Sequence, residues 1–453
     1  MKIANLLIKN AQIIATMDDE RKEISNKSIY CENGKIIDIG DLENFNYNPG
    51  LIIDAHEMVV IPGLVNTHHH LFQTLTKAII KAQNASLFDW LKILYPIWSR
   101  ITSVELKSAV KIGLSELMTS GCTTTSDHLY IFPNGIKLED EIEVAQTLGI
   151  RFHSTRGSMS IGESNGGLPP DYLVEDENFI IKDSQDIINK WHDPSHGSMI
   201  RIALAPCSPF SVSKELMRDT AILAREYNVG LHTHLAENSD DVEYSKRMFG
   251  LTPGQYIEEL GWIGKDVWHA HCVKLNNEEI DLFSRTGTSV SHCPCSNMRL
   301  GSGILPLNKM LDKGVNVGLG VDGSASNDSG NLLNEARQAL YLQRVNETNN
   351  FYLNARNVLW LATAGGAIAL NRDDIGSIKV GNCADFAIYD STSLELAGSV
   401  EDPIGGLIFC GPLKTRWTIC NGQIISENNN IKNICIEDTI NQHNSLSRKL
   451  INS

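Results

Sequence analysis

The sequence lacks the features that mark several large classes of protein. It has no apolar run long enough to cross a bilayer. Its first residues, Met1 to Ile14, have neither a basic start nor an uninterrupted apolar core, so we expect no signal peptide. Basic residues are outnumbered, with 39 Lys and Arg against 54 Asp and Glu and a net charge of −15. Because like charges repel, nucleic acids and anionic membranes are disfavoured as partners, and a small neutral substrate is expected.

Cysteine is also scarce for the length of the chain. Ten cysteines are spread over 453 residues, and no pair of Cys-x-x-Cys motifs occurs among them. This pattern excludes a disulfide scaffold and a zinc ribbon, and it is typical of reduced thiols in a cytoplasmic protein. Low-complexity tracts are absent, and the 42% of hydrophobic residues is enough for a large buried core. The length suits one large domain and a smaller one.

The apolar pattern predicts an α/β protein whose two ends form one small domain. Residues 1–60 carry short alternating apolar runs that are separated by turn signals. The same pattern returns in residues 375–430. We therefore expect the two segments to pair into a β-sandwich. Residues 431–453 are assigned to a C-terminal helical extension.

Between these ends, in residues 61–374, strand-like runs alternate with stretches of helical spacing. The eight strand-like runs are Val59–Val65, Thr123–Asp127, Arg151–Ser154, Ile200–Ala205, Gly230–His234, Val267–His271, Ser289–His292 and Val315–Val321. Eight such units predict a TIM-like (β/α)₈ barrel, whose active site lies where the strands end. A doubly wound open sheet is the alternative. No glycine-rich dinucleotide motif or phosphate loop supports that alternative.

Pairs of histidines separated by one residue end three of these runs. With 14 histidines in the chain, chance produces such a pair only roughly 0.4 times. The three pairs are His68 and His70, His232 and His234, and His269 and His271. Because side chains alternate along a strand, both members of each pair are expected on one face, toward the interior of the barrel.

A fourth run ends on Asp322, which glycines flank on both sides. An isolated aspartate of this kind is more often a turn or helix-cap residue, but the histidines favour a metal ligand. Imidazoles and a carboxylate are the ligands of hydrolytic zinc or ferrous centres, which lower the pKa of a coordinated water from 15.7 to about 7. A two-metal site needs a bridging ligand, commonly a lysine after the fourth strand. The segment Leu204–Ser208 contains no lysine, so one metal is expected.

Four segments, taken together and in this order, resemble the amidohydrolase superfamily, specifically its nucleobase-deaminase and triazine-hydrolase branch. They are Pro62–His70, His234–Glu237, His271–Val273 and Val321–Asn327. The resemblance covers nearly the whole chain, and the combination is specific although each motif alone is not. Asn66 stands where the family frequently has aspartate. The resemblance implies a metal-dependent hydrolase of a cyclic amidine C–N bond.

Further segments are similar to 8-oxoguanine deaminases. They are Gln83–Ala85, Ser126–Tyr130, Gly166–Asp171, Ala205–Phe210 and His292–Arg299. The similarity implies deamination of a purine-like base, 8-oxoguanine, to urate and ammonia. Guanine deaminases resemble this chain less, because they carry an Arg-Phe pair where it has Cys207 and Ser208. Hydrolysis of an aminotriazine such as hydroxyatrazine (an ethylaminohydrolase reaction), deamination of guanine or a pterin and, more remotely, a non-catalytic scaffold are the alternatives.

The resemblance and the chemistry of the side chains assign roles to individual residues. The implied ligands of one divalent metal, Zn²⁺ first and Fe²⁺ as the alternative, are His68, His70, His234 and Asp322. Asp322 also carries a proton from the attacking water to the departing amine. His271 polarises the attacked centre. Glu237 protonates the neighbouring ring nitrogen, and the alternative for it is a solvated acid at a helix start.

Four further residues are candidates for contact with the substrate. Gln73 offers an amide that both donates and accepts, which suits the edge of a purine. Arg156 can bind a carbonyl oxygen of the substrate or form a structural ion pair. Cys207 and Trp98 are weaker candidates, because a buried thiol and a core tryptophan are the more common roles. Related enzymes suggest a homo-oligomer.

Overall fold

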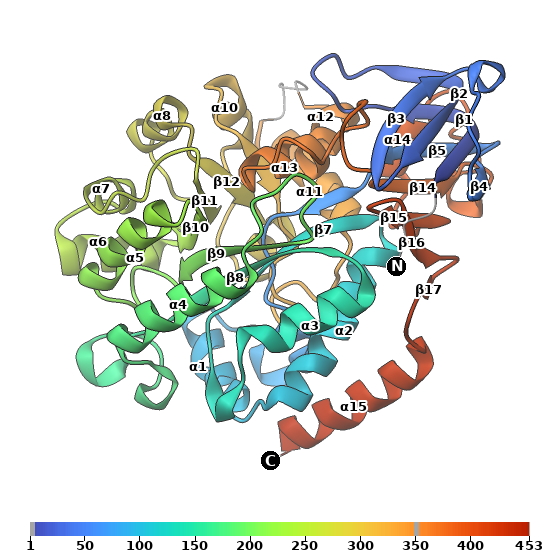
Figure 1. Cartoon of the computed structure of the whole chain (residues 1–453). Helices are drawn as coiled ribbons and strands as arrows, with labels where there is room; N and C mark the ends of the chain where they lie inside the picture. Colours follow the sequence, from blue (N-terminus) through green and yellow to red (C-terminus); the bar gives the residue numbers. More distant parts are fainter. Residues whose placement is uncertain (1–4, 348–352, 453) are drawn as a thin grey trace.

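The computed structural model describes residues 5–347 and 353–452. Eight parallel strands form a closed barrel inside a layer of helices (Figure 1). In chain order they are β6 (Leu64–Asn66), β7 (Cys122–Leu129), β8 (Arg151–Ser158), β9 (Ile200–Pro206), β10 (Gly230–Leu235), β11 (Val267–His271), β12 (Ser289–His292) and β13 (Val317–Leu319). Each strand pairs with the next, and β13 returns to β6. The predicted (β/α)₈ barrel is therefore confirmed.

Helices follow the strands of the barrel along the chain. They are α1 (Leu87–Trp98), α2 (Ser103–Thr119), α3 (Leu138–Leu148), α4 (Glu177–Trp191), α5 (Lys214–Glu226), α6 (Ser239–Phe249), α7 (Pro253–Glu259), α8 (Asn277–Thr286), α9 (Pro294–Arg299), α10 (Leu307–Asp312), α11 (Leu332–Asn346), α12 (Ala355–Trp360) and α13 (Gly366–Ala369). Polar residues begin most of them; for example, Asp176 accepts the N–H of Phe179 at the start of α4. Within the described chain, no helix has the length and apolar character to cross a membrane.

The two ends of the chain build a second sheet, seen as blue and red strands beside the barrel (Figure 1). Its strands are β1 (Leu6–Ala15), β2 (Glu23–Glu32), β3 (Lys35–Gly40), β4 (Leu51–Asp54), β5 (Met58–Pro62), β14 (Phe386–Asp390), β15 (Trp417–Cys420), β16 (Gln423–Glu427) and β17 (Asn430–Ile431). The order is β17-β16-β15-β14-β5-β1-β2-β3, and β4 also pairs with β1. Hydrogen bonds thus join strands from both ends of the chain into one sheet, as the predicted pairing of the two ends requires.

Both faces of the sheet are buried along its central strands. In β5, Val59 and Ile61 join the hydrophobic core of the barrel, whereas Val60 joins a separate core of the small sheet. In β14, Tyr389 belongs to the first core and Ile388 to the second. Because side chains alternate along a strand, a strand between two cores reads as a continuous apolar run.

The first strand-like run of the sequence is divided between the two sheets. Residues 58–62 form β5 in the small sheet, and residues 64–66 form β6 in the barrel. Gly63 lies at the division, where a β-carbon would approach Thr123 Oγ1 to 2.0 Å. The prediction of one strand over Val59–Val65 is therefore wrong, because an apolar run does not show where a chain leaves one sheet for another.

Helix α14 (Pro403–Phe409) lies between β14 and β15, and helix α15 (Ile436–Asn452) ends the described chain. Helix α15 packs against α2 and the 3₁₀ segment Leu71–Thr76. The hydroxyl of Ser447 donates to the carbonyl of Leu75 at 2.7 Å, and His443 Nε2 bonds the carbonyl of Thr74 at 3.1 Å. The C-terminal helix therefore supports the segment that follows His70.

A buried ion pair connects the barrel to the small sheet. Arg151, at the start of β8, donates from Nε and Nη2 to the carboxylate of Asp385 at 3.2 Å. Both side chains are almost completely buried. The N–H of Asn421, which follows β15, also donates to this carboxylate at 2.6 Å. The ion pair thus holds the small sheet against the barrel, although the two sheets share no strand.

Loss of one partner from this pair should be costly. The change Arg151→Met leaves the Asp385 carboxylate buried without its cation, and we expect the free energy of unfolding to fall by about 3–5 kcal/mol. Urea unfolding followed by circular dichroism measures the loss. As a control, Lys9→Met breaks an exposed pair with Asp54 and should cost at most about 1 kcal/mol. Equal losses in the two variants would contradict the assignment.

Candidate active site

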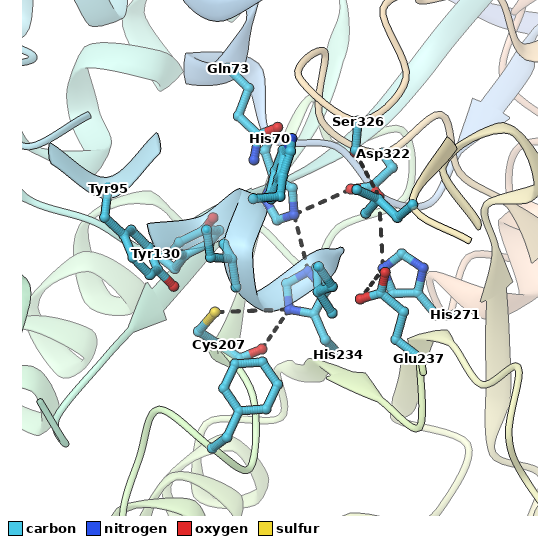
Figure 2. Close-up of a pocket in the computed structure, with 15 residues that line it drawn as sticks. His70, Gln73, Tyr95, Tyr130, Cys207, His234, Glu237, His271, Asp322 and Ser326 are labelled. Atoms are coloured by element: carbon cyan, nitrogen blue, oxygen red, sulfur yellow. Dashed lines mark hydrogen bonds and ion pairs between the residues drawn. The ribbon is translucent and has the colours of Figure 1, made fainter. Parts of the chain in front are cut away.

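The four predicted metal ligands lie together where three barrel strands end. His70 Nε2 is 3.0 Å from His234 Nε2. Asp322 Oδ1 is 3.2 Å from His68 Nε2 and 3.4 Å from His70 Nε2. Figure 2 shows His70, His234 and Asp322 turned toward one another. Ligand atoms at the usual 2.0–2.1 Å from a tetrahedral zinc ion are about 3.3 Å apart, so the separations suit a single ion.

Hydrogen bonds to backbone carbonyls orient two of the imidazoles. His70 Nδ1 bonds the carbonyl of His128 at 2.7 Å, and His234 Nδ1 bonds the carbonyl of Cys207 at 2.6 Å. A carbonyl oxygen only accepts, so each Nδ1 carries the hydrogen and each Nε2 keeps its lone pair. This is the arrangement in which a histidine ligates a metal through Nε2.

His68 is oriented by a second histidine below it in the barrel. His68 Nδ1 lies 2.8 Å from His232 Nε2, and His232 Nδ1 lies 2.8 Å from the carbonyl of Trp268. The carbonyl requires the hydrogen on His232 Nδ1, so His232 Nε2 accepts from His68 Nδ1. His68 Nε2 then keeps its lone pair. Of this pair, His232 therefore orients His68, whereas His234 faces the proposed metal position.

The donor set fits a divalent cation. His68 Nε2 is buried and has no hydrogen-bond partner among the described residues. Burial lowers the pKa of all three imidazoles, that of His234 to about 3, so they are neutral at ordinary pH and have lone pairs free for a metal. Three nitrogen lone pairs and a carboxylate that face one another repel in a low-dielectric site. A zinc or ferrous ion removes this repulsion, and these are the donors such ions bind.

Asp322 reaches the cluster from a left-handed backbone conformation, with a φ of 63°. Its N–H donates to the carbonyl of His68 at 3.1 Å, and its Oδ1 accepts the N–H of Gly323 at 2.7 Å. Burial raises the pKa of this carboxyl, but the imidazoles of His68 and His271 beside it outweigh burial and hold the pKa well below its usual value. Asp322 is therefore an anion that can accept a proton.

Glu237 and His271 lie beside Asp322. His271 Nε2 is 3.7 Å from Glu237 Oε2 and 3.8 Å from Asp322 Oδ2, and Figure 2 shows the imidazole between the two carboxylates. Burial raises the pKa of Glu237 above its usual value, which suits a proton donor. Burial lowers the pKa of His271, but the charges of Glu237 and Asp322 outweigh burial, and its pKa is raised overall.

The third histidine pair does not share one face. His269 points into the helix layer, where its Nε2 bonds the carbonyl of Trp262 at 3.0 Å and its ring contacts Phe283. His271 turns into the site because its φ is 69°. The prediction that both face the interior is therefore wrong for this pair, since the backbone leaves the extended conformation at the end of β11.

The cavity above this cluster is small, buried and largely apolar. Its 15 lining residues are His70, Gln73, Leu87, Trp90, Leu91, Tyr95, Tyr130, Cys207, Phe210, His234, Glu237, His271, Leu300, Asp322 and Ser326. Helix α1 contributes Leu87, Trp90, Leu91 and Tyr95 as one wall. No lysine or arginine is present among these lining residues. The cavity therefore suits a neutral, flat ring more than an anion.

Two of the predicted substrate contacts line the cavity. The oxygen of the Gln73 amide accepts the N–H of Ala325 at 3.3 Å, which turns the NH₂ group toward the cavity (Figure 2). Cys207 lies beside His234, and burial raises the pKa of its thiol to about 12. Gln73 thus offers hydrogen-bond donors, and Cys207 offers a small neutral group.

The other two predicted contacts lie outside the cavity. Arg156 points into the helix layer, where it forms ion pairs with Glu175 at 2.8 Å and Asp183 at 2.6 Å. Trp98 is fully buried, and its Nε1 donates to Thr76 Oγ1 at 3.0 Å. Arg156 therefore forms the structural ion pair that was its alternative role, and Trp98 is a core residue. The sequence alone does not show which helices and loops supply their partners.

Several residues of the site had no predicted role. His128 lies near the end of β7 and Tyr130 directly follows the strand; the His128 ring stacks on that of His234, and Tyr130 lines the cavity. Both belong to the segment Ser126–Tyr130, so the signal was available in the similarity to deaminases. Phe210 likewise belongs to the segment Ala205–Phe210, which is similar to deaminases. Trp90 had no such signal, because an aromatic residue in a helix reads as core.

A (β/α)₈ barrel with imidazoles and carboxylates at its strand ends defines a class of hydrolytic enzyme. Residues 59–437 match the model of the amidohydrolase family, and the chain belongs to that family. It is similar to 8-oxoguanine deaminase of Pseudomonas aeruginosa, with 45% identity over 380 residues that cover 82% of this chain and 84% of that protein. With these deaminase and hydrolase relatives, the chain is a hydrolytic aminohydrolase.

Two further comparisons extend the range of relatives. An isoxanthopterin deaminase from an unknown prokaryotic organism is 34% identical over 430 residues, covering 89% of this chain and 88% of that protein. The crystal structure of atrazine chlorohydrolase from Arthrobacter aurescens TC1, complexed with zinc, matches with a TM-score of 0.93 and 32% identity, covering 98% of this chain and 100% of that one.

Metal binding and turnover should separate in two variants. The change His234→Ala removes a metal ligand, so we expect loss of metal and of activity together. The change Glu237→Gln keeps the four ligands but removes the proton donor, so metal should stay while kcat falls about 100- to 10,000-fold. Elemental analysis and steady-state kinetics measure both quantities.

The control is His269→Gln, because His269 is an equally buried histidine outside the cluster. This variant should keep its metal. Full activity of Glu237→Gln would refute the role of Glu237, and full metal content in His234→Ala would refute the ligand set.

A pair of buried carboxyl groups supports the segment after His70. Asp127 Oδ1 accepts the N–H of Leu71 at 2.7 Å, and Asp127 lies against Glu141 of α3. Both side chains are fully buried. Burial raises the pKa of both groups, and the charge of Asp127 raises that of Glu141 further. The folded protein therefore keeps a proton on this pair that the unfolded chain releases.

Stability should consequently fall as the pH rises above the usual carboxyl pKa. The folded state binds more protons there than the unfolded state, so each increase in pH favours unfolding. The change Glu141→Gln removes one acid and should weaken this dependence, measured as unfolding midpoints in urea between about pH 5 and about pH 8. Glu143→Gln, an exposed acid on the same helix, should leave the dependence unaltered. An unaltered slope in Glu141→Gln would contradict the shared proton.

Proposed function

We propose that the protein is a metal-dependent deaminase that converts 8-oxoguanine to urate and ammonia. The observation that carries the proposal is a buried cavity without cationic side chains, directly above the cluster of His68, His70, His234 and Asp322. Such a cavity suits a neutral heterocycle. The 45% identity to 8-oxoguanine deaminase of Pseudomonas aeruginosa supports this choice among heterocycles.

The proposed cofactor is one zinc ion. The zinc complex of atrazine chlorohydrolase, 32% identical over nearly the whole chain, supports zinc over iron. A divalent metal in this position supplies a Lewis acid and lowers the pKa of a coordinated water to about 7. The remaining chemistry is assigned to side chains of the protein.

Three side chains move or stabilise protons in the proposed reaction. Asp322 accepts a proton from the attacking water at Oδ2 and passes it to the departing amine. Glu237, whose pKa is raised by burial, donates a proton from Oε2 to the ring nitrogen beside the attacked carbon, where negative charge builds up. His271 lies between them and polarises the attacked centre.

The proposed substrate contacts are Gln73 and Cys207. The NH₂ group of Gln73 faces the cavity and is suited to donate to a carbonyl oxygen of the base. Cys207 is small and neutral, so it leaves room at the position where guanine deaminases, by resemblance, carry a larger Arg-Phe pair. The apolar wall of α1, with Trp90 and Leu91, covers the faces of a flat ring.

An aminotriazine hydrolase is the second candidate function. The apolar lining from Leu87, Phe210 and Leu300 offers contacts for alkyl groups, and a triazine hydrolase structure matches with a TM-score of 0.93. The same side chains carry the chemistry in this case, but the leaving group is an alkylamine.

Steady-state assays on a panel of substrates separate the candidates. We expect 8-oxoguanine to have the highest kcat/KM, because Gln73 and Cys207 complement a neutral dioxo-purine. The panel contains 8-oxoguanine, guanine, isoxanthopterin, cytosine and hydroxyatrazine, with release of ammonia or ethylamine as the signal. Turnover of hydroxyatrazine alone would refute the purine assignment.

The change Gln73→Leu should raise KM for the purine most, and an unchanged KM would remove Gln73 from the proposed contacts.

A further inference from the structure

Helix α9 and the turn after it, residues 294–303, take no part in the proton transfers described above, although Leu300 lines the cavity. This segment, here called the platform, follows β12 and overlaps the sequence His292–Arg299 that resembles deaminases. Three of its polar residues, Ser296, Asn297 and Ser302, are buried but do not line the cavity. Each of them is nevertheless linked by hydrogen bonds to one of the three groups assigned to the proton transfers, Asp322, His271 or Glu237.

Asn297 orients His271. The amide oxygen Oδ1 of Asn297 lies 2.9 Å from His271 Nδ1. An amide oxygen only accepts, so the Nδ1 of His271 carries a hydrogen and donates it. The opposite ring nitrogen, Nε2, is thereby turned toward Glu237 and Asp322.

Ser302 orients Glu237. Its hydroxyl donates to Glu237 Oε1 at 3.1 Å, which leaves Oε2 as the oxygen that faces His271. The N–H of Ser302 donates to the carbonyl of Asn297 at 2.8 Å. The supports of Glu237 and His271 are therefore tied to each other through the backbone of the platform.

Ser296 reaches Asp322 through one further hydroxyl. Ser296 Oγ donates to Ser326 Oγ at 3.0 Å, and Ser326 Oγ donates to Asp322 Oδ2 at 3.3 Å. Figure 2 shows Ser326 directly beside Asp322. This bond engages Oδ2, whereas Oδ1 faces the imidazoles of the cluster.

The platform is itself anchored to helix α11. The N–H of Cys295 donates to Glu335 Oε2 at 3.0 Å, and Asn327 Nδ2 donates to Glu335 Oε1 at 2.8 Å. Glu335 is fully buried. One carboxylate thus links the platform to the loop that carries Asp322 and Ser326.

We propose that residues 294–303 are a positioning element that holds Asp322, His271 and Glu237 in one fixed relation, through Ser296, Asn297 and Ser302. This inference rests on the proposed proton transfers. The geometry supports it because three separate hydrogen-bonded connections start from one short segment and end on three different reacting groups. These residues act through the reacting groups and do not touch the substrate.

Ser302→Ala in the metal-loaded enzyme tests the proposal. We expect kcat to fall about 10- to 100-fold, as for other residues that orient an active-site group, with KM and metal content unchanged. Ser302→Thr, which keeps the hydroxyl, should restore kcat. In a double variant with Glu237→Gln, the serine change should have no further effect, because it acts only through Glu237.

Met298→Ala is the matched control, since Met298 lies on the same platform and is 43% exposed. It should leave kcat and KM unaltered. A multiplicative loss in the double variant, or a fall in metal content with Ser302→Ala, would overturn the positioning role.

Crystal structures of the Ser302→Ala and Asn297→Ala holoenzymes provide a readout that does not depend on turnover. We expect the carboxylate of Glu237 in the first, and the imidazole of His271 in the second, to leave their single orientation while the metal ligands stay in place. Unchanged side chains would overturn the proposal. If 8-oxoguanine is not a substrate, these structures still test the platform, so its failure and that of the proposed function are distinguishable.

Discussion

The arrangement of the site depends on the hydrogen bond that each of the three clustered imidazoles makes through Nδ1. His70 and His234 bond backbone carbonyls, and His68 bonds His232. These bonds place the hydrogen on Nδ1 and leave the Nε2 lone pairs of the three imidazoles facing the cluster, where those of His68 and His70 lie beside Asp322 and that of His234 beside His70. Lone pairs this close repel in a buried site, and a cation removes the repulsion. The metal chemistry of the protein follows from this constraint on the tautomers.

The barrel makes the convergence possible, and local breaks in its strands complete it. Parallel strands bring their carboxyl ends to one rim. At this rim the chain adopts left-handed conformations at Ala236, His271 and Asp322, with φ values of 49°, 69° and 63°. Such conformations are costly for residues other than glycine and persist where the surroundings hold them. Here they turn Glu237, His271 and Asp322 toward each other, out of the alternation of the strands.

The sequence allowed much of the site to be predicted for a physical reason. His68, His70 and His234 stand at strand ends with a spacing of two, and the strand period alone places the members of a pair on one face. The eight strand-like runs likewise predicted the barrel, because a buried parallel strand is apolar along its whole length. The division of Val59–Val65 between two sheets was missed, since both sheets bury the same kind of side chain.

The fold class, the types of side chain in the cluster and the family could be inferred from the chain without a structure, because these depend on periodicity and on motifs that are local in the sequence. Which candidates face the cavity became known only from the folded arrangement. Arg156 forms ion pairs with Glu175 and Asp183, and His269 points into the helix layer. Their partners lie on other elements of the fold, and a local pattern contains no information on which charge or surface will lie opposite a side chain.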